Sequence, residues 1–380
     1  MGGEQAMRRK FIFVMALALL LPCAGGAALA GAVTLAPVAH ACTGIELTAK
    51  DGGVVAARTL EFGIDPKSEV MVVPAGTAIT GTLPDGGKGI SYVTKYGVVG
   101  ANGFGQPVIL DGINEAGLYV GLFYFPGYAS YADATKDNAS RAMGPHEYGI
   151  WLLGNFANVD EVTANFDKVV LTSVVVAALK EVPPVHFVVH DRTGKSIVIE
   201  PVDNVLKLHE NPLGVMTNSP TFDWHMTNLR NYVNLSATNV PPIALRDIKL
   251  AQFGEGSGMH GLPGDFTPPS RFVRAVAFSQ AAIASDTAQQ SVLQAFHILN
   301  NFDIPLGSVR QMMGGTPIAE FTAWTSASDL NNLRWHFRTY NDQSIRSIDL
   351  RAALTAANGK VRTISMDSQQ SVLDLSTSFR

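Results

Sequence analysis

Short runs of β-branched and aromatic residues alternate with turn-forming residues along most of the chain, and such runs predict strands. Two of them, 185–190 and 195–200, are separated by Asp191-Arg192-Thr193-Gly194 and predict a β-hairpin. A second pair is expected at 321–325 and 333–340, joined by the polar stretch 326–332. The remaining strand-like segments are 53–59, 69–74, 89–100, 107–111 and 117–125.

Helical patterns fall between these strand clusters. Apolar residues recur at helical spacing in 145–156, 159–170, 270–283 and 288–299. A Gly- and Pro-rich stretch, 254–269, is the expected long loop. Strands lie at both ends and in the middle of the chain, with helices between them. This order favours an α+β fold, in which helices cover sheets, and it does not favour a regular βαβ repeat.

The first 41 residues have the pattern of an export leader. Three basic residues, Arg8-Arg9-Lys10, precede an apolar run at 11–21, which is shorter than the ~20 residues that a membrane span needs. Ala39-His40-Ala41 forms a small-x-small cleavage site, and Ala28-Leu29-Ala30 forms another. We therefore expect a removable leader, 1–41, one domain, 42–380, and a periplasmic or secreted protein, with the choice between the two cleavage sites open.

Composition and charge exclude several classes of function. The chain has 380 residues, of which 47% are hydrophobic and 16% charged, with a formal net charge of −4. Loss of the leader changes the charge to about −6, and no basic stripe interleaved with aromatic residues is present, so nucleic acid is not an expected partner. No segment after the leader is apolar enough to cross a membrane. A mature chain of roughly 340 residues is long enough to bury a large core.

Cys42 stands out because it follows Ala41 and is the only cysteine after the leader; Cys23 lies inside it. An exported protein with a single cysteine cannot form an internal disulfide with it. Cleavage after Ala41 would leave a thiol and a free α-amine on one residue, which together supply a nucleophile and a base. Lipid attachment at Cys42 or Cys23 is the alternative, although neither follows a clean Leu-small-small pattern.

The residues after Cys42 predict a hairpin. The turn Lys50-Asp51-Gly52-Gly53 precedes a strand at 54–62, and pairing of the two strands would bring Arg58 and Glu61 back beside Cys42. An arginine near a thiol lowers its pKa and favours the thiolate. A carboxylate near an α-amine orients the amine and tunes its proton affinity. An ordinary surface pair at a strand end is the alternative interpretation of Arg58 and Glu61.

Other chemistry-bearing motifs are absent from the sequence. It contains no Walker loop, HExxH, CxxC or GxSxG motif, and Gly103-Phe104-Gly105 lacks the third glycine of a dinucleotide site. His186 and His190 are expected to be ordinary strand residues, and the isolated histidines are expected to be surface or core residues. Those isolated histidines are His225, His297 and His336. We expect no metal and no organic cofactor.

Four ordered motifs resemble the choloylglycine hydrolase and penicillin V acylase family of N-terminal-nucleophile, linear amide hydrolases. The first motif is Cys42-Thr43-Gly44 followed by Arg58-Thr59-Leu60-Glu61-Phe62, and the second is Asp111–Leu118 (DGINEAGL) followed by Phe125-Pro126-Gly127-Tyr128. The third motif is Thr217–Trp224 (TNSPTFDW). The fourth is Gly261–Phe266 (GLPGDF) followed by Ser270–Arg274 (SRFVR). The matches extend from Cys42 to about Tyr340, which is most of the mature chain.

This resemblance implies an αββα sandwich of two sheets between helices, and it implies a homotetramer. It also implies residue roles, with Glu61 standing where the family more often has Asp. The implied site comprises the nucleophile Cys42 with its α-amine as proton shuttle, the flanking Arg58 and Glu61, the oxyanion-holding Asn218, the second arginine Arg271, and the substrate or oxyanion contacts Tyr124 and Phe62.

The resemblance also implies an N-acyl amide as substrate. Tyr124 stands where penicillin acylases tend to have Tyr and bile-salt hydrolases Asn. We therefore expect penicillin-V-like or N-acyl-homoserine-lactone substrates, with conjugated bile salts as the alternative. The phenyl rings of Phe123 and Phe125, which flank Tyr124, are expected on the opposite face of its strand. A non-catalytic exported binding protein or lipoprotein on the same scaffold is the alternative from another class.

Overall fold

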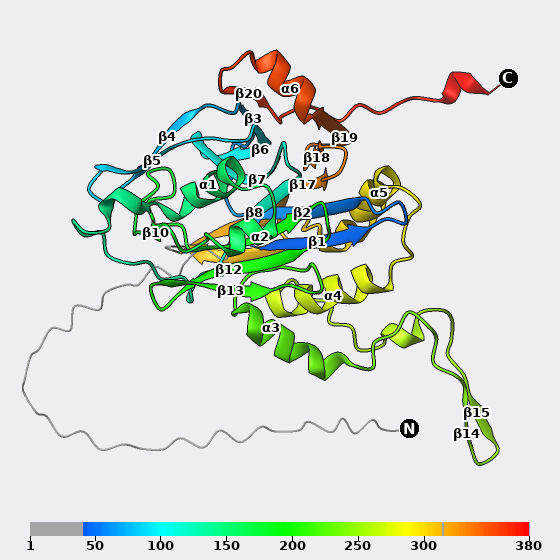
Figure 1. Cartoon of the computed structure of the whole chain (residues 1–380). Helices are drawn as coiled ribbons and strands as arrows, with labels where there is room; N and C mark the ends of the chain where they lie inside the picture. The colour runs from blue at the N-terminus through cyan, green and yellow to red at the C-terminus, as the bar shows by residue number, and fades with distance from the viewer. Residues whose placement is uncertain (1–40, 314, 380) are drawn as a thin grey trace, which may run out of the picture. The chain divides into compact units, whose positions relative to one another are not determined.

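The computed structural model describes residues 41–313 and 315–379. The basic and apolar parts of the predicted leader, Cys23 and both predicted cleavage motifs up to His40 lie outside these residues. The described chain is built around two β-sheets that pack face to face (Figure 1).

The first sheet has the strand order β1-β2-β17-β18-β19, with β16 paired to β17, and all its neighbouring strands are antiparallel. Its strands are β1 (Cys42–Thr48), β2 (Val54–Phe62), β16 (Val309–Met313), β17 (Thr316–Asp329), β18 (Arg334–Thr339) and β19 (Asp342–Asp349). Every residue of β2 is buried, since the sheet is covered on both faces.

The second sheet has the order β13-β12-β11-β8-β7-β6-β3-β20. Its strands are β3 (Glu69–Val73), β6 (Val98–Gly103), β7 (Gln106–Asn114), β8 (Leu118–Tyr124), β11 (Val185–Asp191), β12 (Ser196–Val202), β13 (Val205–Glu210) and β20 (Arg362–Ser365). The indole N–H of Trp335 in β18 donates to the buried carboxylate of Asp111 in β7 over 2.8 Å, which ties the two sheets together.

Helices cover the outer face of each sheet. Helices α4 (Pro268–Ala281) and α5 (Ala288–Leu299) pack on β1, β2 and β17, while α1 (Tyr148–Asn155) and α2 (Val159–Thr163) pack on the second sheet. Contacts of β1 with β8 and of β17 with β7 join the inner faces. The order helix, sheet, sheet, helix confirms the expected αββα sandwich of the α+β class.

Smaller elements complete the fold. They are the helices α3 (Phe222–Asn228) and α6 (Leu350–Ala357), the strand pairs β4 (Ala78–Thr82) with β5 (Lys88–Val93), β9 (Ala142–Met143) with β10 (Val170–Leu171) and β14 (Ile243–Leu245) with β15 (Ile248–Leu250), and 3-10 turns at Ala139–Arg141, Pro145–Glu147, Leu229–Tyr232, Ser257–Met259, Asn300–Phe302 and Ser376–Ser378.

Several sequence-based boundaries were wrong for identifiable reasons. The helix expected at 159–170 ends at Thr163, because the Asn165 side chain donates to the Glu161 carbonyl and competes with the helix. The chain then forms the short strand β10 instead of more helix. The polar stretch 326–332 is not a linker, since β17 continues to Asp329 and pairs with β18 across a tight turn. The stretch 89–100 contains parts of two strands, β5 and β6.

Candidate active site

The β1–β2 hairpin forms as predicted, and its register fixes the faces on which its side chains lie. Cys42 pairs with Leu60, and Gly44 pairs with Arg58. Directly opposed residues share a face of a sheet, so Cys42, Arg58 and Leu60 project toward one side and Glu61 toward the other. Arg58 and Glu61 therefore both return to Cys42, as expected, but they stand on opposite faces of the sheet.

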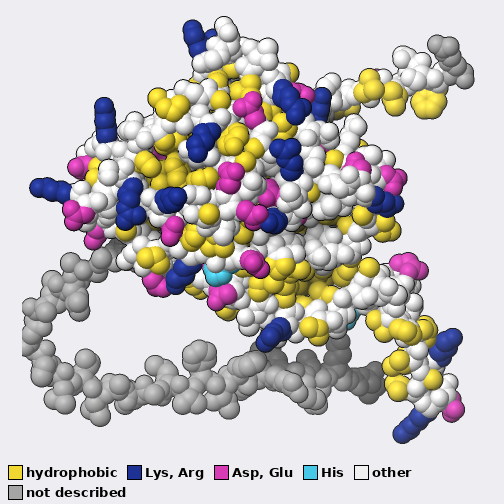
Figure 2. Space-filling model, viewed as in Figure 1, with side chains coloured by type: hydrophobic (Ala, Val, Ile, Leu, Met, Phe, Trp, Pro, Cys, Tyr) yellow, Lys and Arg dark blue, Asp and Glu magenta, His cyan; other side chains and the backbone are white. Residues whose placement is uncertain are grey.

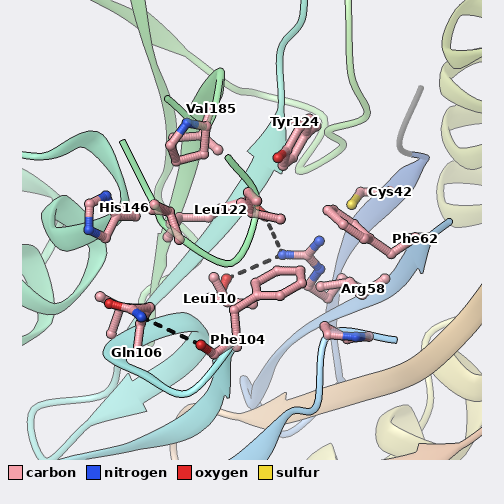
Figure 3. A pocket seen from close by; sticks show the side chains of 17 residues that line it. Cys42, Arg58, Phe62, Phe104, Gln106, Leu110, Leu122, Tyr124, His146 and Val185 are labelled. Atoms are coloured by element: carbon pink, nitrogen blue, oxygen red, sulfur yellow. Dashed lines mark hydrogen bonds between the residues drawn. The ribbon is translucent and has the colours of Figure 1, made fainter. Parts of the chain in front are cut away.

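On one face, the Cys42 side chain lies at one end of an apolar cavity (Figure 3). The cavity encloses about 610 Å³ of space between atoms, including its open mouth, and its walls come from β2, β6–β8 and the 176–185 segment. Apart from Cys42, Arg58 and the residues at the far end, the walls are almost entirely hydrophobic. Its aliphatic and aromatic lining includes Leu60, Phe62, Phe104, Val108, Leu110, Leu122, Tyr124, Val176, Leu179 and Val185.

The Arg58 guanidinium is fully buried beneath Cys42. Its Nη1 donates to the carbonyls of Leu122 at 2.5 Å and Leu110 at 3.3 Å, and its plane lies 4.1 Å from the centre of the Phe123 ring. Its Nη2 has no hydrogen-bond partner among the described residues. The side chain thus places a fixed positive charge next to the thiol, with one donor unused.

The Cys42 thiol is 3% exposed, and burial raises its pKa above the ordinary value. Arg58 and Arg271 act in the opposite direction, as expected of neighbouring cations, but burial outweighs them. Arg58 thus favours the thiolate, as expected, but in the chain that still carries Ala41 the loss of solvation raises the thiol pKa by more than the arginines lower it.

The backbone of Cys42 is held by Asn218 and Arg271. The Cys42 N–H donates to Asn218 Oδ1 over 2.8 Å, and Arg271 Nη2 donates to the same oxygen over 2.6 Å. Arg271 Nη1 donates to the Cys42 carbonyl and to the Thr43 hydroxyl. The fold thus brings together two residues that lie far from Cys42 in sequence, one before α3 and one in α4.

Glu61 lies on the helix-covered face with Arg271. The Thr322 hydroxyl donates to Glu61 Oε1 over 3.2 Å, while Oε2 is buried without a hydrogen-bond partner among the described residues. Burial raises the Glu61 pKa to about 7, although Arg271 opposes the rise. The Glu61 N–H donates to the Ala41 carbonyl over 2.9 Å, so Glu61 borders the Ala41–Cys42 peptide bond.

Tyr124 and Phe62 line the cavity, as expected for substrate contacts. Their rings are 5.4 Å apart in an edge-to-face arrangement. The Tyr124 hydroxyl donates to Glu181 Oε1 over 2.8 Å, and its carbonyl accepts from Asn218 Nδ2 over 2.8 Å. A contact from Tyr124 to a substrate oxyanion would therefore come from its backbone rather than from its hydroxyl.

The two phenyl rings beside Tyr124 do not line the cavity, in line with the expected strand alternation. Phe123 supports Arg58, and Phe125 stacks on the His186 ring with centroids 4.2 Å apart.

Two histidines near Asn218 were missed as contributors to the site. His225 Nε2 lies 2.8 Å from the Asn218 carbonyl, and burial lowers the His225 pKa to about 4, so the neutral ring donates this bond. His186 lies 3.1 Å from the carbonyl of Thr217. Neither contact has a local sequence signal, because the partners come from different elements.

Residues 41–313 and 315–379 contain neither a metal-binding cluster nor a membrane-spanning helix. There is no group of three or more His, Cys, Asp or Glu side chains that could hold a metal ion. None of the helices there has the length and apolar character of a membrane span.

A comparison of the whole chain with known families decides the family assignment. The model of the linear amide C–N hydrolases, choloylglycine hydrolase family, matches residues 42–363. The chain belongs to this family. The resemblance inferred from the four motifs is thereby confirmed, and the protein is an amidohydrolase acting on linear amides.

The relatives include both bile salt hydrolases and a penicillin V acylase. A bile salt hydrolase/transferase of Clostridium perfringens is 32% identical over 81% of this chain and 92% of the relative, and a penicillin V acylase of Pectobacterium atrosepticum is 26% identical over 80% and 79%. Among solved structures, a variant of conjugated bile acid hydrolase from Clostridium perfringens matches with a TM-score of 0.78 and 30% identity, covering 87% of this chain and 99% of that chain. Penicillin V acylase from Agrobacterium tumefaciens shares the fold, with a TM-score of 0.68 and 23% identity over 86% and 92%.

The non-catalytic alternative loses its basis in this comparison. A binding protein on a decayed scaffold would be expected to have lost the site. Here Asn218 and Arg271 bond to each other and to Cys42, and Arg58 is fully buried with its charge near the thiol.

Proposed function

We propose that Cys42, once it is the first residue of the mature chain, is the nucleophile that cleaves N-acyl amides. The observation that carries this proposal is the position of Cys42, with its thiol at the end of an apolar cavity and its nitrogen bound to Asn218. The family match begins at the same residue.

Apart from the substrate and one water molecule, the proposed reaction needs only groups of this chain. The thiol gives its proton to the α-amine of Cys42, and the thiolate attacks the amide carbonyl carbon. The ammonium then protonates the leaving amine, and water activated by the same amine hydrolyses the acyl-thioester. Release of the leader would add a positive charge beside the thiol, which lowers its pKa and offsets the effect of burial.

Asn218 is the proposed oxyanion donor. Its Nδ2 carries two hydrogens, of which one is donated to the Tyr124 carbonyl, and the second is available for a substrate oxygen. Its Oδ1 is fixed by Cys42 and Arg271, so the amide cannot flip. One such donor typically lowers the barrier by ~3–4 kcal/mol. We assign Arg271 to hold this amide, Arg58 to stabilise the thiolate, and Glu61 to orient the α-ammonium with its unused buried oxygen.

The cavity is proposed to hold the acyl group, because its walls near Cys42 are apolar and include Phe62 and Tyr124. We favour aryl or fatty acyl amides of the penicillin-V or N-acyl-homoserine-lactone type. Conjugated bile salts are the second candidate, favoured by the names of relatives that are about one-third identical. Turnover of penicillin V, a long-chain acyl-homoserine lactone and glycocholate, compared by kcat/KM, tests the choice; glycocholate as clearly the best substrate would overturn it.

The mechanism is tested by Cys42→Ala, which should abolish turnover, whereas Cys42→Ser should retain the geometry with a weaker nucleophile. An alanine variant that still hydrolyses the amide would refute the mechanism. The mass of the mature N-terminus, measured on protein recovered from the periplasm or medium, tests export and processing. A chain that begins at Gly31, or a lipid adduct on Cys42, would refute the proposed free terminal cysteine.

We further propose that the protein is a homo-oligomer, a tetramer by family resemblance. Support comes from the β14–β15 hairpin, which projects from the lower right of the view in Figure 1 and carries exposed apolar side chains, coloured yellow in Figure 2. A contiguous apolar surface of this kind is typical of a protein–protein contact. The exposed large apolar residues of this arm are Val240, Ile243, Leu245, Ile248, Leu250 and Phe253.

A further inference from the structure

A buried His–Glu pair lies behind the proposed oxyanion donor. His186 in β11 is fully buried, and its Nδ1 lies 3.2 Å from Oε1 of Glu200 in β12, which is 1% exposed. On the other side of the ring, Nε2 lies 3.1 Å from the carbonyl oxygen of Thr217, the residue before Asn218. None of these residues lines the cavity beside Cys42.

The chemistry of the partners gives the direction of the contact to Thr217. The Thr217 carbonyl is only an acceptor, so His186 Nε2 donates to it. The opposite side of the ring, at Nδ1, faces Glu200, so this carboxyl group holds the ring in the orientation that reaches Thr217.

Glu200 also accepts a hydrogen bond from the other end of the loop that begins at Thr217. Its Oε1 accepts the N–H of Phe222 over 3.0 Å, and Phe222 is the first residue of α3. Glu200 therefore connects, through His186, to the residue before Asn218 and, directly, to the residue that ends the loop. Removal of this carboxylate would free the Phe222 N–H and leave the His186 ring, which bonds to Thr217, without its partner at Nδ1.

We propose that Glu200 and His186 are positioning residues, which fix the backbone at Thr217 and thereby aim the Asn218 amide at the substrate oxyanion. This inference rests on the proposed role of Asn218. A donor must stand within tenths of an ångström of its place to stabilise the transition state, so a small backbone shift at Thr217 should cost turnover rather than substrate binding.

The pair can be compared with a similar one elsewhere. His190 in β11, which is buried, and Glu46 in β1, whose side chain is 11% exposed, form a second pair, with Nδ1 and Oε2 2.8 Å apart. This pair has no contact with the 217–222 segment among the described bonds, so it provides a control for the general cost of breaking a His–Glu pair on β11.

The test measures kcat, KM and Cys42 alkylation by iodoacetamide in the processed enzyme. Glu200→Ala should lower kcat about 10- to 100-fold, with KM changed less than about threefold, because the acyl cavity is untouched. Alkylation should proceed at the wild-type rate, since it needs the thiol but no oxyanion donor. Glu200→Gln retains an acceptor for Phe222 and should recover most of kcat, and Glu46→Ala should retain wild-type kcat.

A second variant, at His186, tests the inference independently if Glu200→Ala does not fold. His186→Phe keeps a ring against Phe125 but removes the donor to Thr217, and it should lose kcat as Glu200→Ala does. Wild-type kcat in a folded His186→Phe enzyme, or an equal loss in Glu46→Ala, would overturn the inference. If neither Glu200→Ala nor His186→Phe folds, the pair serves the fold as a whole and the inference is also wrong. Activity in Cys42→Ala would instead overturn the proposed function itself.

Discussion

The buried Glu61 carboxyl predicts a stability that depends on pH. In the folded chain that retains Ala41, burial raises the Glu61 pKa from 4.5 to about 7. The folded state therefore holds the proton more tightly than the unfolded state. Glu61→Gln keeps the acceptor for the Thr322 hydroxyl but cannot ionise, so it isolates the cost of the buried charge.

The sign and size follow from the linkage between proton binding and folding. Below about pH 4.5 the carboxyl is protonated in both states, and the charge costs nothing. As the pH rises from about 4.5 to about 7, the wild type loses stability, because the unfolded state releases the Glu61 proton while the folded state must retain it or ionise in a dry site. The rise from 4.5 to about 7 corresponds to a loss on the order of 3 kcal/mol in the free energy of unfolding.

The assay is urea unfolding of both proteins, each retaining Ala41, at about pH 5 and about pH 8. The stability of Glu61→Gln relative to wild type should increase by about 2–3 kcal/mol between the two conditions, with the change spread over the range from about pH 5 to about pH 7. The control is Glu210→Gln, which alters an exposed carboxylate on β13 and should show no such change. A difference between Glu61→Gln and wild type that is the same at both pH values would refute the reasoning.

Three other substitutions test separate parts of the molecule. Asn218→Ala should lower kcat about 100- to 1,000-fold with little change in KM, measured by steady-state turnover, and an unchanged kcat would remove Asn218 from the oxyanion site. Leu179→Trp narrows the cavity and should raise KM about tenfold for a bulky acyl group while Cys42 alkylation stays normal; an unchanged KM would mean that the acyl group binds elsewhere. Ile248→Asp places a charge on the exposed arm and should shift the protein to a smaller species in light scattering after size-exclusion chromatography, whereas an unchanged mass would exclude the arm from the interface.

The local part of the site could be predicted from the sequence because it lies in one hairpin. The Lys50–Gly53 turn and the two short runs around it determine the pairing, and the pairing returns Arg58 and Glu61 to Cys42. The hairpin at 185–200 and helix α5 were also predictable, since each has strong periodicity and clear ends. The αββα sandwich itself rested on family resemblance, because the pattern alone predicted only sheets covered by helices.

The long-range part could not be predicted in this way. No periodicity indicates that His186 and Glu200 support the residue before Asn218, since these contacts join β11, β12 and a loop. Burial at Cys42 could not be read from the sequence either, and burial raises the thiol pKa by more than Arg58 lowers it. Charge spacing predicts which groups are neighbours, but the dielectric surroundings that decide their pKa values depend on the complete fold.

The pairing of β1 with β2 decides which charged side chain lies beside the Cys42 thiol, so the length of the turn between the two strands matters. Side chains alternate between faces, so a slip of one residue would move Arg58 to the helix-covered face and bring Glu61 to the cavity face. The thiol would then have an anion in place of a cation as its neighbour, without any change of residue type. An insertion or deletion of one residue in the Lys50–Gly53 turn is therefore expected to be more harmful than most substitutions there, and length variation should be tolerated only where a bulge restores the parity of the strands.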